Sequence, residues 1–560
     1  MLANAACPPA ATSCQHCMRA STSGSRCDIK YGWDWHKNIS ENDAKSSLPG
    51  MRIVHGVEAL MPSTPGVEVI SRWKQSNWPS IARDLAPGLV RAASAQDKQR
   101  LCRLWKREHS YQSWPVLLGC PGTAPVEHEP ACGNEGAVIS ISCATVDLTS
   151  DPVLAGGVYD ATRFFRVTHS QHPPEVCKAR KEREVVLPAL GVAMSVYPTA
   201  LGHFVPEQLP TALLLHAHLP PHVPIVVADA GVPRRYLQPL IDTGVVPRGR
   251  FLFQPLRNDG TVMRADKVYT VLNSHWSNAM SGDVAMRAAR HAYQPHGAVP
   301  LTRRTTVLVV DRGAGRRGVK NKLEMGREIE SAIADAIAGR GASWIGGSGG
   351  SSSIGGGSAA GGGGSSRGSA NSMRVVHWRP NPVNMSADIE AFRHAALIVA
   401  PHGAGLANLL FAPEGTPVIE ICYDDFGDPN ARGMICPAMY AAMAANLHLP
   451  YWVVTASGKY DTAMTVDLPQ LRRAMLSALD TVRAARAAKR TAAGATAGGS
   501  TGGGSSADAA GADGGGVGAE VVGLLKRLKR RCPGGKNGTR AAATMSYFAK
   551  AQQHASVDAV

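Results

Sequence analysis

Short, almost entirely apolar runs alternate with amphipathic stretches in the second half of the chain. Such runs are typical of strands buried on both faces, and apolar residues at helical spacing between them are typical of covering helices. We predict strands over residues 305–310, 373–378, 396–400 and 416–422, and helices over 323–337, 386–395 and 468–489, with a further helix starting at 406–411. Because strands and helices alternate, the pattern predicts one complete doubly wound α/β domain with a parallel sheet.

The same alternation precedes this region. We predict strands over 184–187, 223–227 and 249–254, and helices over 206–218 and 234–241. A β-rich stretch at 136–148 is expected to begin the sheet. The chain is therefore expected to contain two domains of the same α/β class.

Gly/Ser/Ala-rich stretches set the expected domain boundaries, because such residues cannot build a core. The expected organisation is a disordered N-terminus (1–50), a Cys- and Trp-containing N-terminal region (51–150), an N-terminal domain (151–300), a C-terminal domain (301–490) with a solvated insertion at 341–372, a linker (491–520) and a basic tail (521–560). The insertion contains a formal G-x-S-x-G at 346–350. It lacks the preceding strand and following helix of a nucleophile elbow, so we discard that interpretation.

Charge and cysteine content narrow the class of protein only in part. The chain has 59 Lys+Arg against 43 Asp+Glu, a formal net charge of +16, which favours phosphate, nucleic acid, acidic glycans or anionic membranes without choosing among them. Most of the 12 cysteines lie in the first 177 residues, which is compatible with a luminal domain that has several disulfides. Cys14, Cys17 and Cys27 with His36 match no well-defined zinc finger.

Neither a signal peptide nor a membrane span is visible in the chain. Residues 1–30 lack an apolar core behind a basic start. The best uncharged run, 209–228, contains four prolines and three histidines, which no lipid-embedded helix would carry. Sequons at Asn38, Asn384 and Asn537 give weak support for a glycoprotein.

The segment at 396–422 contains the most informative chemistry. A buried strand leads into Pro401-His402-Gly403-Ala404-Gly405, then a helix that starts at 406–411 with Asn408 in its first turn, then a second strand ending in Glu420. Glycines at a strand-to-helix turn allow a ligand to approach the backbone, and a helix N-terminus suits a diphosphate. His402 would hydrogen-bond or neutralise that charge, Asn408 would cap the helix or touch the ligand, and Glu420 would accept ribose hydroxyls. Together these residues predict a nucleotide site.

The same segment carries a family resemblance. The run PHGAGLANLLFAPEGTPVIEI at 401–421 is very similar to the signature of glycosyltransferase family 61. Two upstream segments also match family patterns: GHFVPEQLP at 202–210 and VLVVDR at 307–312, which is followed by Arg316, Arg317 and Asn321. Val466-Asp467-Leu468 resembles the closing pattern. The matches stand in family order and span about residues 150–485.

The resemblance implies a GT-B architecture, in which two Rossmann-like doubly wound domains face a cleft, here with low-complexity insertions. It implies an inverting transferase that moves a pentose or N-acetylglucosamine from a UDP-sugar to a hydroxyl of a polysaccharide or glycoprotein. The second domain would bind the donor and the first the acceptor. It also implies a location in the lumen of the Golgi or the endoplasmic reticulum. No cofactor beyond the UDP-sugar substrate is expected.

Candidate residues follow from what this chemistry requires. A departing diphosphate needs positive charge, and Arg312, Arg316 and Arg317 follow a predicted strand; we expect Arg312 and one of the other two to serve. Inversion needs a general base, and His203 and Glu207 lie four residues apart. Either is the base, or one orients the other; Asp229 is a lesser candidate.

Two further interpretations compete with the transferase. A catalytically inactive nucleotide- or glycan-binding scaffold of the same fold is the alternative function. Nucleic-acid binding is not expected, because the chain lacks interleaved aromatic residues and any recognised module. No D-x-D motif follows a strand, so we predict no obligatory metal.

Overall fold

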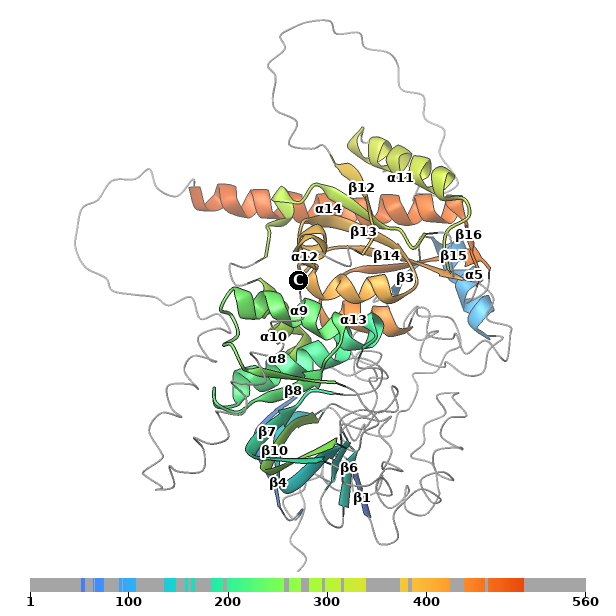
Figure 1. The fold of residues 1–560 in the computed structure, drawn as a ribbon. Helices are drawn as coiled ribbons and strands as arrows, with labels where there is room; N and C mark the ends of the chain where they lie inside the picture. Colours follow the sequence, from blue (N-terminus) through green and yellow to red (C-terminus); the bar gives the residue numbers. More distant parts are fainter. Residues whose placement is uncertain are drawn as a thin grey trace, which may run out of the picture. The chain divides into compact units, whose positions relative to one another are not determined.

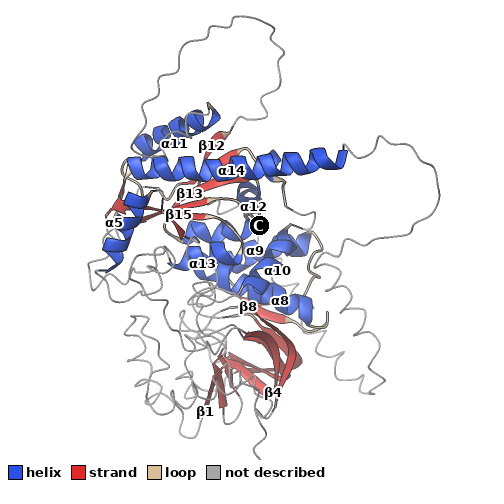
Figure 2. Ribbon diagram, turned by 180° about the vertical axis from the view of Figure 1, so that it is seen from behind, coloured by secondary structure: helices blue, strands red, loops and turns tan. Residues whose placement is uncertain are grey.

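The computed structural model describes residues 52–497 with gaps, of which the longest are 75–89, 107–134, 167–182, 339–372 and 424–437. Residues 1–51 and 498–560 lie outside the described part, as do the zinc-like cysteines, the sequons and the low-complexity insertion. Met1–Ala492 form one compact unit and Ala493–Val560 a second. Within the first unit the described elements build two sheets with helices between them (Figures 1 and 2).

The sheet of the second half contains the four predicted strands together with three that were not predicted, β15, β16 and β3. Its strands are β11 (Thr306–Val310), β12 (Arg374–Trp378), β13 (Ala395–Pro401), β14 (Val418–Tyr423), β15 (Tyr451–Ser457) and β16 (Thr465–Val466), joined by β3 (Val90–Arg91). Their order is β12-β11-β13-β14-β15-β16, with β3 pairing with β15. All pairs are parallel except β15 with β16. The core strands β11, β13 and β14 are buried along their whole length, as their continuous apolar sequences require.

Helices cover both faces of this second sheet. They are α11 (Lys322–Ile337), α12 (Met385–Arg393), α13 (Ala438–Asn446), α14 (Leu468–Ala497) and the 3₁₀-helix η5 (Ala404–Phe411). Figures 1 and 2 show α11 and α14 on the side away from the first sheet and α13 on the side toward it. The helix predicted to begin near residue 406 is thus a 3₁₀-helix, whose turns are tighter than those of an α-helix.

The sheet of the first half is mixed, and this corrects the expectation of a purely parallel doubly wound sheet. Its order is β1-β6-β5-β4-β10-β7-β8-β9, with β2 pairing with β4. β10, β7, β8 and β9 form one parallel set and β1 pairs in parallel with β6, whereas the pairs made by β4 and the pair β5–β6 are antiparallel. The strands are β1 (Arg52–His55), β2 (Val67–Lys74), β4 (Glu135–Asp147), β5 (Gly157–Tyr159), β6 (Arg163–Arg166), β7 (Arg183–Val192), β8 (Ile225–Ala228), β9 (Phe251–Gln254) and β10 (Thr261–Leu272).

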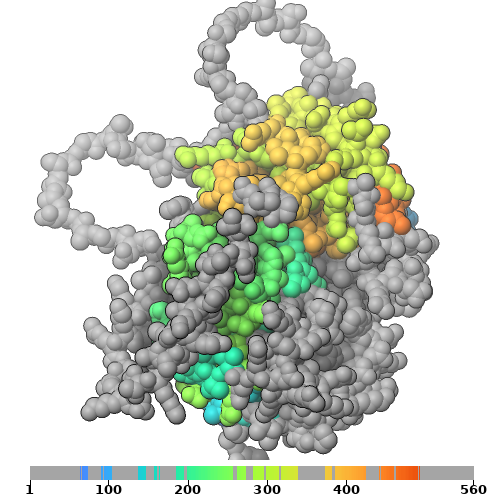
Figure 3. All heavy atoms as spheres, viewed as in Figure 1, coloured from blue at the N-terminus to red at the C-terminus, as the bar shows by residue number. Residues whose placement is uncertain are grey.

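The helices of the first half lie between the two sheets (Figures 1 and 2). They are α7 (Leu201–His203), the π-helical turn η2 (Phe204–Gln208), α8 (Leu209–His218), α9 (Gly231–Asp242) and α10 (Asp283–Tyr293). A short 3₁₀-helix, η3 (Leu301–Arg303), leads into β11. The space-filling view shows the green surface of this half directly against the gold surface of the second (Figure 3).

Buried polar contacts fasten the two halves together. The Tyr236 hydroxyl of α9 donates to Asn408 Oδ1 of η5 at 2.8 Å, and the Gln294 side chain donates to the Phe411 carbonyl at 2.7 Å. Arg290 of α10 donates to the carbonyls of Leu410 and Leu447. One continuous apolar core includes residues of both halves. These contacts fix α9 and α10 of the first half against η5 of the second half.

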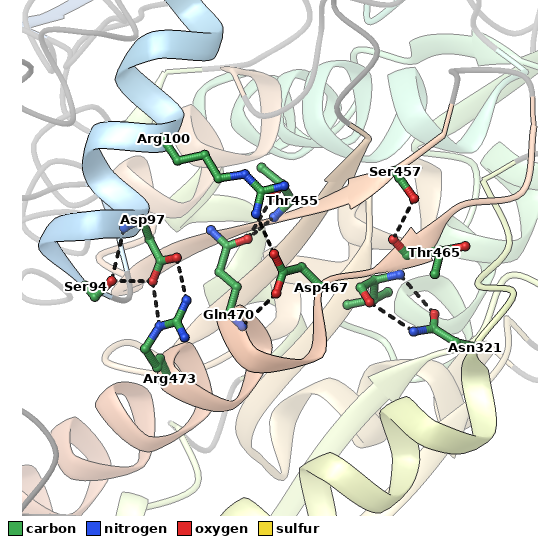
Figure 4. Close-up of polar contacts among 11 residues, drawn as sticks. Ser94, Asp97, Arg100, Asn321, Thr455, Ser457, Thr465, Asp467, Gln470 and Arg473 are labelled. Atoms are coloured by element: carbon green, nitrogen blue, oxygen red, sulfur yellow. Dashed lines mark hydrogen bonds and ion pairs between the residues drawn. The ribbon is translucent and has the colours of Figure 1, made fainter.

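The region before residue 150 contributes to both sheets, whereas the sequence predicted it as one separate N-terminal region. β1, β2 and β4 join the first sheet, and β3 pairs with β15 at the edge of the second. Helix α5 (Ala95–Lys106) follows β3 and lies beside α14 and β15 (Figures 1 and 4). A fragment that starts near residue 150 would therefore lack an edge strand and a covering helix of the second sheet.

Two ion pairs hold α5 against the start of α14 (Figure 4). Asp97, which is buried, accepts two hydrogen bonds from Arg473 at 2.7 and 2.9 Å. Ser94 caps α5 by accepting the Asp97 N–H, and its hydroxyl donates to the Asp97 carboxylate. Arg100 donates to Asp467 at 2.5 Å, while the other oxygen of Asp467 caps α14 through the Gln470 N–H.

Replacing Asp97 with Asn should destabilise the chain by about 2–3 kcal/mol, because it leaves buried polar groups without their charged partner. Burial alone raises the pKa of the Asp97 carboxyl, but hydrogen bonds from Arg473 and Ser94 outweigh it, so its pKa lies below the usual value. The stabilisation is thus present at neutral pH and is lost as the pH falls below about 4. Chemical denaturation of the full chain at pH 7 measures it. Asp480→Asn, which removes the exposed pair with Arg483, is the control and should cost less than about 1 kcal/mol; equal costs would contradict the prediction.

Candidate functional site

The strand order of the second sheet locates its binding edge. In chain order β11, β12, β13, β14 and β15 are strands 1 to 5, so the sheet order reads 2-1-3-4-5. The order reverses between β11 and β13, and ligands of open parallel sheets bind at the carboxyl ends of the strands at such a point. Arg312 follows β11 and His402 follows β13. The two strongest candidate residues of the sequence therefore lie at the position where topology predicts a ligand.

Arg312 lies over the glycine that follows His402. Its Nη1 donates to the His402 carbonyl at 2.6 Å. Gly403 has φ +149°, and a Cβ added there would lie 1.1 Å from Nη1 of Arg312. Only a residue without a side chain lets the guanidinium occupy this place. Arg312 and Gly403 thus form one unit at the start of η5.

The residues after Gly403 shape the turn. A Cβ at Gly405 would lie 3.1 Å from Val310 Cγ1, so η5 packs closely on the end of β11. Asn408 is completely buried; it donates to the Gly405 carbonyl at 3.3 Å and accepts the Tyr236 hydroxyl. Asn408 lies inside η5, whose N-cap is Gly403 without a side-chain cap hydrogen bond, so its side chain does not serve as the predicted cap but joins η5 to α9. Ala404 lies at the N-terminus of η5, beside the first half of the chain.

Behind the turn, His402 belongs to a buried chain of polar groups. Its Nδ1 lies 2.6 Å from Glu420 Oε1, and the Tyr451 hydroxyl donates to Glu420 Oε2. Glu420 is fully buried. The expectation that Glu420 accepts ribose hydroxyls is therefore corrected, because both carboxylate oxygens are engaged inside the protein. Tyr451 was not singled out from the sequence, because nothing local distinguishes a tyrosine at the start of a strand.

Asp311, also missed from the sequence, organises the positively charged edge. Its carboxylate accepts hydrogen bonds from Lys322 at 2.5 Å, Arg379 at 2.6 Å and the Gly313 N–H at 2.9 Å. Burial raises the pKa of Asp311, but these donors outweigh it and bring the pKa to about 2. Asp311 is thus ionised at neutral pH and ties the ends of β11 and β12 to the start of α11. This contact restricts the backbone next to Arg312.

The predicted base candidates lie on the other side of η5. His203 ends α7 and Glu207 lies in η2; His203 Nδ1 is 2.7 Å from Glu207 Oε1. A Cβ at Gly202 would lie 3.5 Å from Ala404 Cβ and 3.8 Å from the Tyr440 hydroxyl. The GHF segment and the glycine loop, about 200 residues apart in sequence, are therefore neighbours. The side chain of His203 is 32% exposed and that of Glu207 is 14% exposed, so the imidazole is the more accessible of the two.

The other candidates lie apart from this centre or outside the described residues. Arg317 adopts φ +59° and its N–H bonds to the Thr462 carbonyl, beside β16. Asn321 forms two hydrogen bonds with the backbone of Val466, so two of the family-like segments meet there (Figure 4). Arg316 lies outside the described residues. Asp229 is paired with Arg234 at the end of β8.

Three further features of the described residues concern metal binding, disulfide bonds and membrane-spanning helices. The described residues contain no group of three or more His, Cys, Asp or Glu that would hold a metal ion. Cys102 of α5 and Cys422 of β14 are disulfide-bonded, whereas Cys143 of β4 is free and exposed. Among the helices described, none is long and apolar enough to cross a membrane.

Comparison with known families adds one match. The family model described as Glycosyltransferase 61 matches residues 365–419, a segment that contains β12, α12, β13 and η5 and reaches into β14. No curated protein matches the chain. The match includes His402 and the glycine turn, ends one residue before Glu420, and supports a glycosyltransferase activity. The resemblance to glycosyltransferase family 61 is thereby confirmed, and the relationship rests on this segment of the second sheet.

Proposed function

We propose that the chain is an inverting glycosyltransferase of GT-B type that takes a pentose or N-acetylglucosamine from a UDP-sugar. The acceptor is a hydroxyl of a polysaccharide or glycoprotein. The observation that carries the proposal is the contact of Arg312 with the His402 carbonyl over Gly403, at the carboxyl end of the sheet. A guanidinium at this place, beside the N-terminus of η5, suits the charge of a departing diphosphate.

The contact between His203 and Glu207 supports a choice of general base. Glu207 contacts Nδ1 of His203, and the imidazole is the more exposed member of the pair. A ring whose Nδ1 is held by a carboxylate uses Nε2 for proton transfer. We therefore assign His203 as the base and Glu207 as the residue that orients it. In this arrangement the carboxylate orients the histidine and the histidine accepts the proton, as in other enzymes with a base oriented by a third group.

The lumen of the Golgi or the endoplasmic reticulum is the proposed location, as the family resemblance implies. The disulfide-bonded state of Cys102 and Cys422 supports an oxidising compartment, because such bonds are rare where thiols are kept reduced. We propose that no metal is obligatory, since arginine and a helix N-terminus can stabilise the leaving group.

Thermal-shift measurements on the full chain test the donor site. UDP, GDP, CMP and ADP are compared with and without Mn²⁺. Stabilisation by UDP alone, unaffected by Mn²⁺, supports the proposal, and a screen of UDP-sugars then identifies the donor. A folded chain that responds to none of the nucleotides contradicts it. Binding of a nucleotide without transfer to any acceptor on a glycan array would instead support the inactive scaffold.

Arg312→Ala and His402→Gln should each weaken UDP binding by about 10- to 100-fold, because each removes a charged or polar group placed at the diphosphate position. Isothermal titration measures the dissociation constants, and circular dichroism confirms folding. Arg483→Ala on α14 is the control, since this side chain contacts only Asp480 and the Ala336 carbonyl among the described hydrogen bonds. Unchanged affinity in both site variants would contradict the assignment.

A further inference from the structure

His402 is held from three directions. Its N–H donates to the Ile421 carbonyl at 2.9 Å, its carbonyl accepts from Arg312, and its Nδ1 contacts Glu420. The ring packs against two tyrosines, Tyr423 at 6.0 Å and Tyr440 at 5.5 Å between ring centroids. A histidine that served only to fill a turn would not require a buried carboxylate at one specific nitrogen.

The proton between His402 and Glu420 can be assigned from the neighbouring tyrosine. Burial and the charge of Glu420 raise the pKa of Tyr451 well above its usual value, so the phenol keeps its proton and donates it to Oε2. Glu420 is then an acceptor on that side. In the arrangement in which the carboxylate accepts from both neighbours, His402 Nδ1 is the donor to Oε1.

This assignment leaves Nε2 as the other ring nitrogen. Among the described residues, no hydrogen bond to Nε2 is present, although Nδ1 is fully committed. In the part of the chain that the structure describes, the titratable groups shown in contact with the ring are Glu420 and Tyr423 from β14 and Tyr440 from α13. Arg312 bonds the His402 carbonyl, and Tyr451 of β15 lies behind Glu420. Glu420 is the carboxylate among them, and a carboxylate that contacts one ring nitrogen sets the state of the other.

We propose that Glu420, anchored by Tyr451, is the positioning residue of His402: it keeps the proton on Nδ1 and presents Nε2 to the donor nucleotide. The inference rests on the proposed function, since the nucleotide is its ligand. The proposed role explains why a carboxylate, Glu420, is fully buried beside the ring, which packing alone would not require. An apolar residue would fill the same space without fixing the ring.

Selective ¹⁵N labelling of the histidine rings tests the proton assignment in the wild-type chain. His402→Gln identifies the His402 resonances by their loss. We expect a protonated Nδ1 without ligand, and a shift of the Nε2 resonance when UDP is added. In Glu420→Gln the amide can donate as well as accept, so the proton should no longer be confined to Nδ1.

Affinity is the second readout. Glu420→Gln should weaken UDP binding about tenfold, at the lower end of the loss seen for residues that orient metal-bound histidines. Tyr451→Phe acts one contact further from the ring and should weaken UDP binding about threefold. Glu390→Gln is the matched control, because it changes an exposed His–Glu pair, with His394, on helix α12. That variant should bind UDP as the wild type does.

The outcomes separate the inference from the proposed function. Wild-type binding of UDP with unchanged affinity in Glu420→Gln and Tyr451→Phe overturns the positioning role and leaves the donor site standing. A proton on Nε2 rather than Nδ1 in the wild type overturns it as well, even if Glu420→Gln fails to fold. Absence of UDP binding by the folded wild type overturns the proposed function itself.

Discussion

Gly403→Ala should abolish high-affinity nucleotide binding while most of the chain stays folded. A methyl group at this position would lie 1.1 Å from Nη1 of Arg312, so the guanidinium has to leave the His402 carbonyl. The backbone also has φ +149° and ψ −176°, a region that is essentially restricted to glycine and costs other residues about 1–3 kcal/mol. We expect UDP affinity to fall about 100-fold, or about 3 kcal/mol, at the upper end of the loss expected for Arg312→Ala, with a smaller loss of thermal stability. Titration calorimetry and thermal unfolding of the full chain measure the two effects.

A matched variant and a double mutant separate the two effects of Gly403→Ala, the clash with Arg312 and the backbone strain. Gly415 also has a positive φ, +76°, but a Cβ there would meet nothing within 4 Å. Gly415→Ala should therefore cost only the strain of about 1–2 kcal/mol and leave UDP binding unchanged. In the Arg312→Ala background, Gly403→Ala should add little to the loss of affinity, because the clashing side chain is already absent. Fully additive losses would show that Gly403 does not act through Arg312.

Three strands of the second sheet, β11, β13 and β14, were predictable from sequence because they are buried on both faces, whereas β15 was missed although it is buried along nearly its whole length. Continuous apolar runs such as those of β13 and β14, set between amphipathic helices, are typical of such strands. In the first half, β7, β8 and β9 were predicted within a few residues, but β10, which pairs with β7, was not. Local pattern therefore predicted the strands before Arg312 and His402, whereas α10 and α13, which also pack on η5, were missed.

Long-range pairing was not predictable in the same way. β3 has only two residues, yet it extends the second sheet, while β1, β2 and β4 from the same region extend the first. No local period tells which sheet edge such a strand will join. The partners of α5, Arg473 and Asp467 at the start of α14, lie more than 360 residues away in the chain. Only the folded structure brings these charges together.

At the site, the sequence predicted which residues lie together but not what each side chain contacts. His402, Gly403 and Arg312 were predicted together, and the structure places them in contact. Glu420 was predicted to face ligand because it follows a strand pattern, but its side chain points to His402 and Tyr451 inside the protein. Alternation along a strand that is buried on both faces does not indicate which side a polar residue takes.

His203→Ala should lower kcat by about 10²–10⁴-fold with the donor that the nucleotide screen identifies, because it removes the proposed general base. UDP affinity should change less than about threefold, since a base acts on the acceptor hydroxyl and not on the diphosphate. Glu207→Gln should lower kcat less, by loosening the ring that it holds at 2.7 Å. UDP release from the donor in the presence of acceptor measures kcat. His394→Ala, which alters the exposed His394–Glu390 pair, serves as the control and should keep full activity.

Chemical rescue decides between the two members of the pair. If His203 takes the proton, added imidazole should restore part of the activity of His203→Gly, and formate should not restore that of Glu207→Gly. The reverse pattern would assign the base to Glu207 and make His203 the orienting residue. The exposure of the two side chains, 32% for His203 and 14% for Glu207, favours the first result, because an acceptor hydroxyl has to reach the base from solvent. Full activity in both glycine variants would remove the pair from the reaction and require a different base, a role for which Asp229 is poorly suited because it is already paired with Arg234.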